Sequence, residues 1–182
     1  MSKEKVMKFG EKEFLNVVLK KHNLKEELMT KVLFGAGCFW GVEKKFSEFK
    51  GVTDTEVGYS QGISDQTTYE EVCSGNTNHV EVVLVNFNES QVTYADLVKY
   101  FFEIHDPTTL NQQGPDRGTQ YRSLIACYDS TQVKVSEDIK NKLNSTHFNQ
   151  NITTTIELVK NYCPAEDYHQ KYLEKKYSFL NI

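Results

Sequence analysis

The sequence lacks the marks of several large protein classes. Only 3 of its 182 residues are proline, and it has no repeat and no low-complexity tract. No apolar run approaches the roughly 18 residues that a membrane-spanning helix needs. The first residues, Met1 to Lys5, lead into a charged stretch without the apolar centre of a signal peptide. We therefore expect a cytoplasmic protein without a membrane partner.

Excess positive charge is also missing. The chain carries 21 Lys and Arg against 25 Asp and Glu, a net charge of -4, so a phosphate backbone is repelled on average and no nucleic-acid partner is expected. With 38% hydrophobic and 25% charged residues, the chain can bury one core. We expect a monomer with a single catalytic domain over residues 31–182. Residues 1–30 form an N-terminal helical extension in this interpretation, with an amphipathic helix from about 11 to 29.

The cysteines never form a C-x-x-C pair. Cys38, Cys73, Cys127 and Cys163 are widely scattered, and the five histidines lack the spacing of metal ligands. In a cytoplasmic protein this pattern argues against a disulfide framework and against a zinc site. We expect no metal and no cofactor, and one reactive thiol among inert ones.

The spacing of hydrophobic residues predicts the strands and helices of the chain. Strands are predicted at 31–34, 52–59, 80–87, 121–128 and 152–158, and loops at 60–78 and 111–119. Helices are predicted at 39–49, from Thr93 to the His105–Pro107 turn, around 135–143, and briefly in the tail after Pro164. This order predicts an α+β fold, a two-layer sandwich like the ferredoxin-like split βαβ plait, with a mixed and mostly antiparallel sheet.

Cys38 is the candidate nucleophile. It stands where the glycine-rich end of a strand, Gly35 to Gly37, turns into a helix whose exposed N–H groups favour an anion, so we expect a lowered thiol pKa. Phe39 and Trp40, the only tryptophan, follow at once as a small aromatic wall. The alternative is a small buried thiol in a helix start, which is common for free cysteine.

Glu81 is the candidate general acid. It lies inside the most apolar strand, where desolvation raises the pKa of a carboxyl group and keeps it protonated near neutral pH. The alternative is a glutamate that faces solvent or a lysine at the strand end. Two tyrosines are candidate hydrogen-bond donors through their phenol groups: Tyr69 in a predicted loop and Tyr121 at the start of a predicted strand. His169 is the histidine of interest, although a lone histidine is more often structural.

Together these stretches resemble the type A peptide methionine sulfoxide reductase family. Six runs occur in the family's order within residues 31–176. They are Gly37–Gly41, Thr68–Gly75, His79–Glu81, His105–Thr108, Gly114–Ser123 and Ala165–Gln170. The resemblance implies a reductase of the S epimer of methionine sulfoxide, free and in proteins, and hence repair of oxidised proteins under oxidative stress.

The resemblance also implies a role for each site residue. Cys38 would attack the sulfoxide sulfur and become a sulfenic acid, and Glu81 would protonate the departing oxygen. Tyr69 and Tyr121 would hydrogen-bond that oxygen. The remaining residues would bind substrate. Phe39 and Trp40 would form an aromatic pocket for the methyl group on sulfur. A water and hydrogen-bond network near the cysteine would be held by Asp116, His169 and Tyr172.

The sequence departs from its relatives where the enzyme is recycled. Many relatives carry a recycling cysteine in a glycine-rich C-terminal tail, but this chain ends Tyr177 to Ile182 without one. Cys163, next to Pro164 in a predicted loop, is the internal candidate for resolving the sulfenic acid. We expect instead an external thiol partner, namely glutathione, glutaredoxin or thioredoxin.

Two other function classes compete with this interpretation. A cysteine hydrolase would pair Cys38 with His169 or His105, but it would leave Glu81 and the two phenols without a task. A non-catalytic redox sensor would use Cys38 only as a switch. Turnover of methionine sulfoxide separates the reductase from both.

Overall fold

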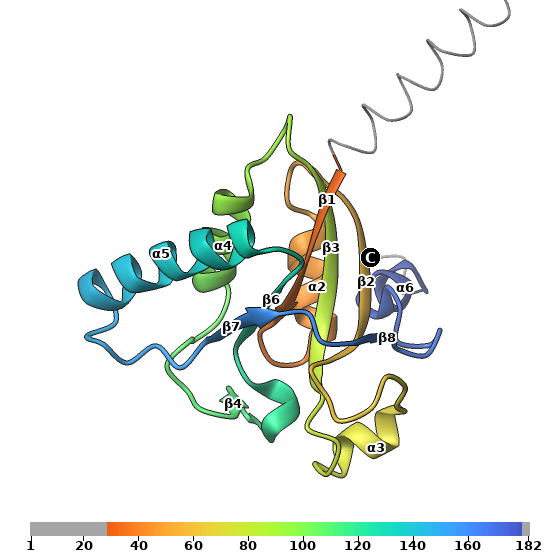
Figure 1. Ribbon diagram of the computed structural model, residues 1–182. Helices are drawn as coiled ribbons and strands as arrows, with labels where there is room; N and C mark the ends of the chain where they lie inside the picture. The colour runs from red at the N-terminus through yellow and green to blue at the C-terminus, as the bar shows by residue number, and fades with distance from the viewer. Residues whose placement is uncertain (1–28, 180–182) are drawn as a thin grey trace, which may run out of the picture.

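The computed structural model describes residues 29–179, which form a curled six-stranded sheet with helices packed on it (Figure 1). The strands of the sheet are β1 (Met29–Gly35), β2 (Val52–Ser60), β3 (Val80–Asn88), β6 (Leu124–Cys127), β7 (Thr155–Leu158) and β8 (Tyr162–Pro164). The helices are α2 (Phe39–Ser47), α3 (Tyr69–Cys73), α4 (Tyr94–Glu103), α5 (Ser130–Thr146) and α6 (Tyr172–Phe179). The predicted N-terminal helix lies outside the described residues, except for Met29, which begins β1.

The sheet has the strand order β7-β6-β1-β3-β2-β8. Only β6 and β7 pair in parallel, and the other neighbours are antiparallel, so the predicted mixed and mostly antiparallel sheet is confirmed. The central strand β3 is paired over nearly its whole length with β1 and β2. Both faces of β3 are largely buried, as its mostly apolar sequence predicts.

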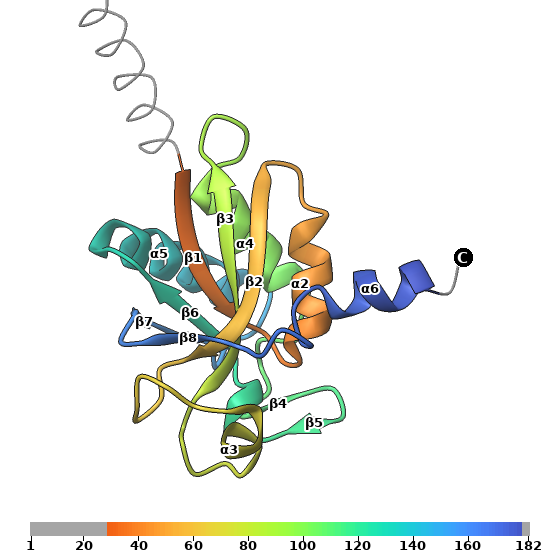
Figure 2. The same ribbon diagram turned by 90° about the vertical axis from the view of Figure 1, so that its right-hand side faces the viewer.

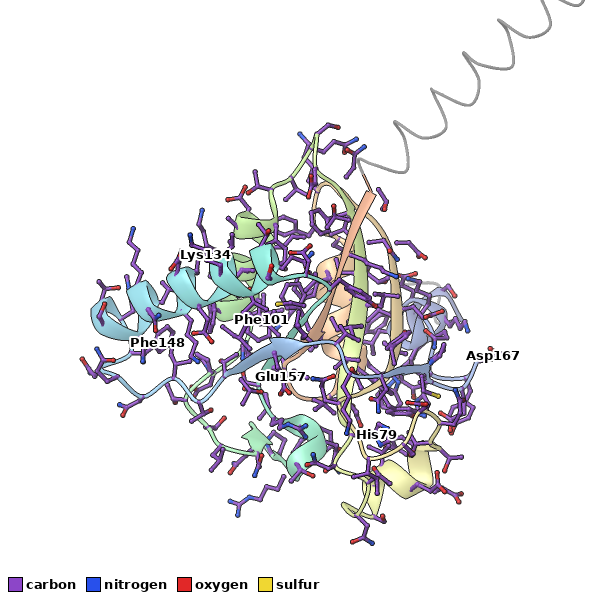
Figure 3. The ribbon with its side chains drawn as sticks, viewed as in Figure 1. His79, Phe101, Lys134, Phe148, Glu157 and Asp167 are labelled. Carbon is purple, nitrogen blue, oxygen red and sulfur yellow. The ribbon has the colours of Figure 1, made fainter. Side chains whose placement is uncertain are left out.

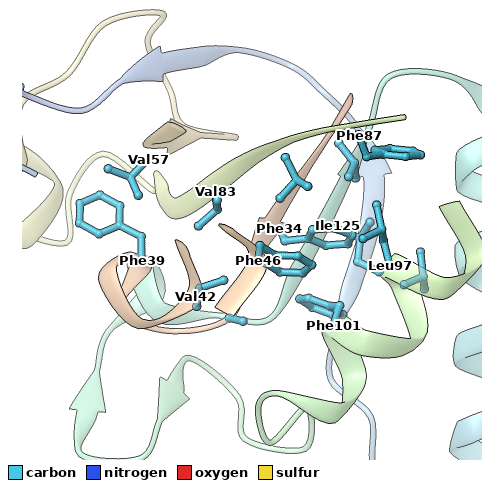
Figure 4. Close-up of a cluster of buried hydrophobic side chains, with 14 of the residues drawn as sticks. Phe34, Phe39, Val42, Phe46, Val57, Val83, Phe87, Leu97, Phe101 and Ile125 are labelled. Atoms are coloured by element: carbon cyan, nitrogen blue, oxygen red, sulfur yellow. The ribbon is translucent and has the colours of Figure 1, made fainter. Parts of the chain in front are cut away.

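The main core lies between one face of the sheet and the helices α2 and α4 (Figure 4). Phe34 of β1 stacks on Phe46 of α2 at 4.8 Å between ring centroids and on Phe101 of α4 at 5.1 Å. Apolar residues at steps of three and four place one face of each helix against the sheet. This packing fixes the start of α2, and with it Cys38, against the end of the sheet.

The opposite face of the sheet is covered by the chain that links β7 to β8. In Figures 1 and 2 this blue segment runs across the strands from one edge of the sheet to the other. Val159 and Tyr162 pack there on a second buried cluster that includes Leu33 and Val82. The side chain of Gln61 ties the segment to the end of β2 through the carbonyl of Leu158 at 3.0 Å.

Several short elements lie where the sequence predicts loops. The 60–78 loop contains the helix α3, whose N-cap residue Thr68 forms a capping box with Glu71. The 111–119 loop contains a two-stranded ribbon, β4 (Gln112–Gln113) paired with β5 (Asp116–Arg117). The three-residue strand β8 was not predicted either. It exists because it pairs with β2, about 100 residues earlier in the chain.

Two predicted strands are shorter than expected. The 121–128 strand begins only at Leu124, because the 3-10 turn η1 (Thr119–Tyr121) precedes it. The 152–158 strand begins only at Thr155, because the N–H of Ile152 is bound by the Asn144 side chain and the N–H of Thr153 by the carbonyl of Pro107. These N–H groups are therefore not available to the β6–β7 ladder.

Candidate active site

The candidate site lies at the end of the sheet where β1 and β2 end and β3 begins. The helix α3, the β4–β5 ribbon and η1 gather around this end (Figure 1). Figure 3 places His79, two residues before Glu81, at the same end. Cys38 is the N-cap residue of α2 and is half-buried.

A close approach of two segments makes Gly37 necessary. Its φ is +88°, and a Cβ at this position would lie 2.6 Å from the Cβ of Gln113 in the ribbon. A side chain on residue 37 would therefore be strained in its backbone and would push the ribbon away. The glycine before Cys38 allows β4–β5 to close over the start of α2.

Glu81 is buried in β3 with 2% of its surface exposed. Its Oε2 accepts a hydrogen bond from the backbone N–H of Phe39, the first residue of α2, at 3.1 Å. Burial raises the pKa of Glu81 to about 7, the Phe39 N–H opposes the rise, and the charge of Asp116 adds to it. A carboxyl group with this pKa holds a proton in a large fraction of molecules at neutral pH.

The predicted fall in the Cys38 pKa is wrong for this structure. Burial raises the thiol pKa more than the N–H groups of Trp40 and Gly41 lower it, and the charges of Glu81 and Asp116 raise it further. The helix terminus therefore acts as expected, but desolvation outweighs it. Because Glu81 is one of the causes, its protonation removes part of the rise.

The two predicted phenols lie within electrostatic reach of the thiol and the carboxyl group. Burial raises the pKa of Tyr121 to about 12, and the charges of Glu81, Asp116 and Cys38 are among the further causes. Burial also raises the pKa of Tyr69, with a hydrogen bond to Cys73 and the charges of Glu81 and Tyr121 as further causes. Both phenols therefore keep their protons and can act as donors. Tyr121 ends the turn η1 rather than opening a strand.

Trp40 is held between two residues that lie far away in the sequence. Its indole Nε1 donates to Nδ1 of His169 at 3.2 Å, and its ring stacks on Tyr172 at 4.1 Å between centroids and 18° between planes. Phe39, in contrast, is only 1% exposed, with its ring directed into the core (Figure 4). Its predicted place in a methyl pocket stays a prediction.

Glu166 is a site residue that the sequence interpretation did not single out. Its carboxylate accepts hydrogen bonds from the Tyr59 hydroxyl and from the N–H of Tyr69, each at 2.9 Å. It also lies 3.8 Å from Nε2 of the buried His169. Burial opposes ionisation, but these hydrogen bonds outweigh it and lower the pKa of Glu166. The acidic position inside the matching run Ala165–Gln170 was the signal that could have identified it.

Neither candidate histidine forms a nucleophile–base pair with the thiol. Both ring nitrogens of His105 are engaged, with the Phe101 carbonyl and the Ser123 hydroxyl, each at 2.7 Å. Since Trp40 donates to Nδ1 of His169, a neutral ring carries its proton on Nε2. Within residues 29–179, no hydrogen bond links either ring to Cys38 Sγ.

The other cysteines have different surroundings. Cys127 is fully buried in β6 beside the Tyr94 hydroxyl, at 3.5 Å, so the predicted core position is confirmed. The sequence predicted a loop around Cys163, but the residue lies in the strand β8, where it is 6% exposed. Its thiol is directed to the Gln66 side chain at 3.4 Å. Cys73 ends α3 and is exposed.

The comparisons with known proteins agree on one family. The sequence model described as peptide methionine sulfoxide reductase matches residues 30–181. The chain belongs to this family. The peptide methionine sulfoxide reductase MsrA of Pelagibacter ubique (strain HTCC1062) is 53% identical over 144 residues, which cover 79% of this chain and 97% of that protein.

Solved structures of the reductase family have the same fold. Methionine sulfoxide reductase A of Corynebacterium diphtheriae matches with a TM-score of 0.78 and 39% identity, over 81% of this chain and 75% of that one. Mxr1 from Saccharomyces cerevisiae in complex with Trx2 matches with a TM-score of 0.58 and 25% identity, over 80% of this chain and 86% of that one.

Family membership confirms the predicted type A resemblance and the predicted enzyme class, an oxidoreductase. In the part of the chain that the structure describes, no helix is long and apolar enough to cross a membrane. Across the same residues, no group of three or more His, Cys, Asp or Glu side chains is arranged to hold a metal ion.

Proposed function

We propose that this chain reduces the S epimer of methionine sulfoxide, free and in proteins, to methionine through a sulfenic acid on Cys38. The single observation that carries the proposal is the hydrogen bond between Glu81 and the Phe39 N–H, which holds a carboxyl group of raised pKa at the residue after the thiol. Repair of oxidised proteins is the role that this activity serves. The family match supports the substrate class.

The chemical step transfers one oxygen atom. The Cys38 thiolate attacks the sulfoxide sulfur and forms an S–S bond, while Glu81 gives its proton to the sulfoxide oxygen, which leaves as hydroxide when the S–O bond breaks. The hydroxide then attacks Cys38 Sγ, and the S–S bond breaks with its electron pair on the methionine sulfur. Tyr69 and Tyr121 donate hydrogen bonds to that oxygen. The products are methionine and Cys38 sulfenic acid, so the thiol is oxidised by two electrons and the sulfoxide is reduced by two.

Substrate recognition combines an aromatic wall with polar groups. Trp40, fixed by His169 and Tyr172, supports an apolar slot for the methyl group on sulfur. Phe39 would form the floor of this slot. Asp116, whose charge contributes to the raised pKa of both reacting groups, belongs to the surrounding hydrogen-bond network.

Recycling proceeds in this proposal through an external thiol. One thiol attacks the sulfenic acid and releases water, and a second reduces the mixed disulfide, which restores the Cys38 thiol. Glutathione, glutaredoxin and thioredoxin are the candidate partners, and the yeast relative crystallised with Trx2 favours thioredoxin.

The surroundings of Cys163 argue against it as an internal partner, because its thiol is buried and bound to the Gln66 side chain. Cys163 pairs with Tyr59, and Tyr59 pairs with Glu81. Cys163 is therefore two strand spacings from Glu81, about 10 Å between Cα atoms. A disulfide requires Cα atoms within about 7 Å, and the Cys163 thiol is directed instead to the Gln66 side chain and the Thr67 carbonyl.

The remaining assignments are proposals of the same kind. We place the protein in the cytoplasm as a monomer, with residues 31–182 as the catalytic domain and residues 1–30 as an extension. The strand order β6-β1-β3-β2, with α2 and α4 on one face, supports a ferredoxin-like plait at the centre of the sheet.

The test is turnover of the two separate epimers of methionine sulfoxide with an excess of dithiothreitol. We expect methionine from the S epimer only, and a dimedone adduct on Cys38 when the reductant is left out. Cys163→Ser is the matched control and should keep full activity with dithiothreitol. Absence of turnover with the S epimer would reject the reductase and favour a redox sensor, and an acyl-enzyme on Cys38 would favour a hydrolase.

A further inference from the structure

Glu43 is a buried carboxylate on α2 that has no part in the chemistry described above. It lies one helical turn after Phe39 and is 2% exposed. Its Oε2 accepts the backbone N–H of Lys171 at 2.9 Å, and its Oε1 lies 3.5 Å from Lys171 Nζ. The Thr55 hydroxyl donates to Oε1 at 3.4 Å. A carboxylate is withdrawn from water only where such partners compensate its desolvation.

Lys171 is fixed by more than this ion pair. Its φ is +51°, which is unusual for a residue with a side chain. Its ammonium group also donates to the carbonyl and the hydroxyl of Thr55 and lies 3.5 Å from Asp54 Oδ1. The contacts of Glu43 therefore join α2, β2 and the turn before α6 at one point.

The neighbour of Lys171 is anchored independently. The Gln170 side chain accepts the N–H of Val57 at 2.9 Å and donates to the carbonyl of Val57 at 2.8 Å, in the manner of an additional strand partner. Residues 170 and 171 are thus held at two different points of β2 and α2. The two residues that flank this anchored pair are His169 and Tyr172.

His169 and Tyr172 are the residues that hold Trp40. The hydrogen bond to His169 and the stack on Tyr172 both join α2 to this turn, three residues before Glu43 on the same helix. A rotation or displacement of residues 169–172 would change both contacts together. The position of the indole beside Cys38 therefore depends on whatever fixes this turn.

We propose that Glu43 is a positioning residue, which holds the 169–172 turn through Lys171 and thereby sets the geometry of the Trp40 wall. The effect on substrate rests on the function proposed above, in which this wall receives the methyl group. The effect on the indole itself does not depend on which substrate the enzyme takes.

The test compares Glu43→Leu with Glu43→Gln. Leucine fills the space but accepts no hydrogen bond, whereas glutamine can still accept the N–H of Lys171. For Glu43→Leu we expect a KM for methionine S-sulfoxide that is about tenfold higher, with kcat changed less than about threefold. Because Trp40 is the only tryptophan, its emission should shift to longer wavelength and be quenched more readily by acrylamide. Glu43→Gln should restore most of both properties.

Glu48→Leu is the matched control at the C-cap of the same helix. Glu48 is exposed and forms an i,i+4 ion pair with Lys44, so this variant should resemble the wild type in both measurements. Unchanged emission, quenching and KM in folded Glu43→Leu would overturn the proposal. So would a loss of kcat at constant KM and emission, which would assign Glu43 to the chemical step.

A second variant decides the matter if Glu43→Leu does not fold. Lys171→Met keeps the backbone N–H for Glu43 but removes the ammonium contacts with Glu43, Thr55 and Asp54. We expect shifts of KM and emission in the same direction but smaller. Wild-type values in Lys171→Met would overturn the proposal. If the wild type fails to reduce methionine sulfoxide, the proposed function fails, but the emission and quenching data still decide the role of Glu43.

Discussion

Replacement of Glu81 by glutamine should make the protein more stable and much less active. The pKa of this buried carboxyl group rises from 4.5 to about 7 on folding. Such a shift corresponds to about 3 kcal/mol. The folded state holds the proton more tightly than the unfolded state, so the stability that this proton contributes is present below pH 4.5 and is lost as pH rises through about 7.

Glutamine has the same shape but does not ionise, and its side-chain oxygen can still accept the Phe39 N–H. The free energy of unfolding of Glu81→Gln should therefore exceed that of the wild type by an amount that grows with pH. We expect the difference to increase by about 3 kcal/mol between pH 4.5 and pH 8. The rate of the reductase step should fall about 10²–10⁴-fold, the usual contribution of a general acid.

The assays are urea unfolding of both proteins, with dithiothreitol present, at several pH values, and single-turnover reduction at neutral pH. Glu48→Gln, at an exposed position, serves as the control for the same chemical change outside the core. A difference in stability that stays constant with pH would show that Glu81 does not have a raised pKa. A Glu81→Gln variant as fast as the wild type would show that the residue is structural.

Three further results are expected. Cys38→Ser should abolish reduction, because an alcohol is a far weaker nucleophile than a thiolate, and activity above a few per cent of wild type would mean that another thiol attacks. Combined replacement of Tyr69 and Tyr121 by Phe should slow the single-turnover step by about 10²-fold, and unchanged kinetics would remove the phenols from the mechanism. Excess substrate without reductant should consume one of the four thiols, whereas loss of two, with a mapped Cys38–Cys163 bridge, would make Cys163 the resolving residue.

The parts of the fold that follow from local pattern were predictable. The apolar run of β3 predicts burial on both faces, and Val82 and Val83, which point to opposite faces, are both fully buried. Thr93 caps α4 by accepting the N–H of Asp96, as its sequence predicts. The helix α3 is too short for periodicity to be visible, although its capping box, Thr68 and Glu71, stands in the sequence.

The parts of the site that depend on distant contacts were not predictable. The hydrogen bonds from Tyr59 and Tyr69 to Glu166 join residues about 100 positions apart, and no local pattern predicts them. The strand that contains Cys163 exists only through its pairing with β2. The sign of the Cys38 pKa shift is a similar case, because it depends on how deeply the thiol is buried, which the motif around it does not specify.

The first turn of α2 stabilises negative charge for two acids at once. The N–H of Phe39 is directed to Glu81, and those of Trp40 and Gly41 to Cys38. The charge of Glu81 raises the pKa of Cys38, and the charge of Asp116 raises the pKa of both groups, so the site favours one charge over two. A thiol beside a carboxylate and a thiolate beside a carboxylic acid differ only in the position of one proton. The second arrangement is the reactive one in the proposed mechanism, because it offers a nucleophile and a proton donor together. The raised pKa of Cys38 is therefore compatible with the proposed mechanism, in which the proton that leaves the sulfur is the one that Glu81 gives to the sulfoxide oxygen.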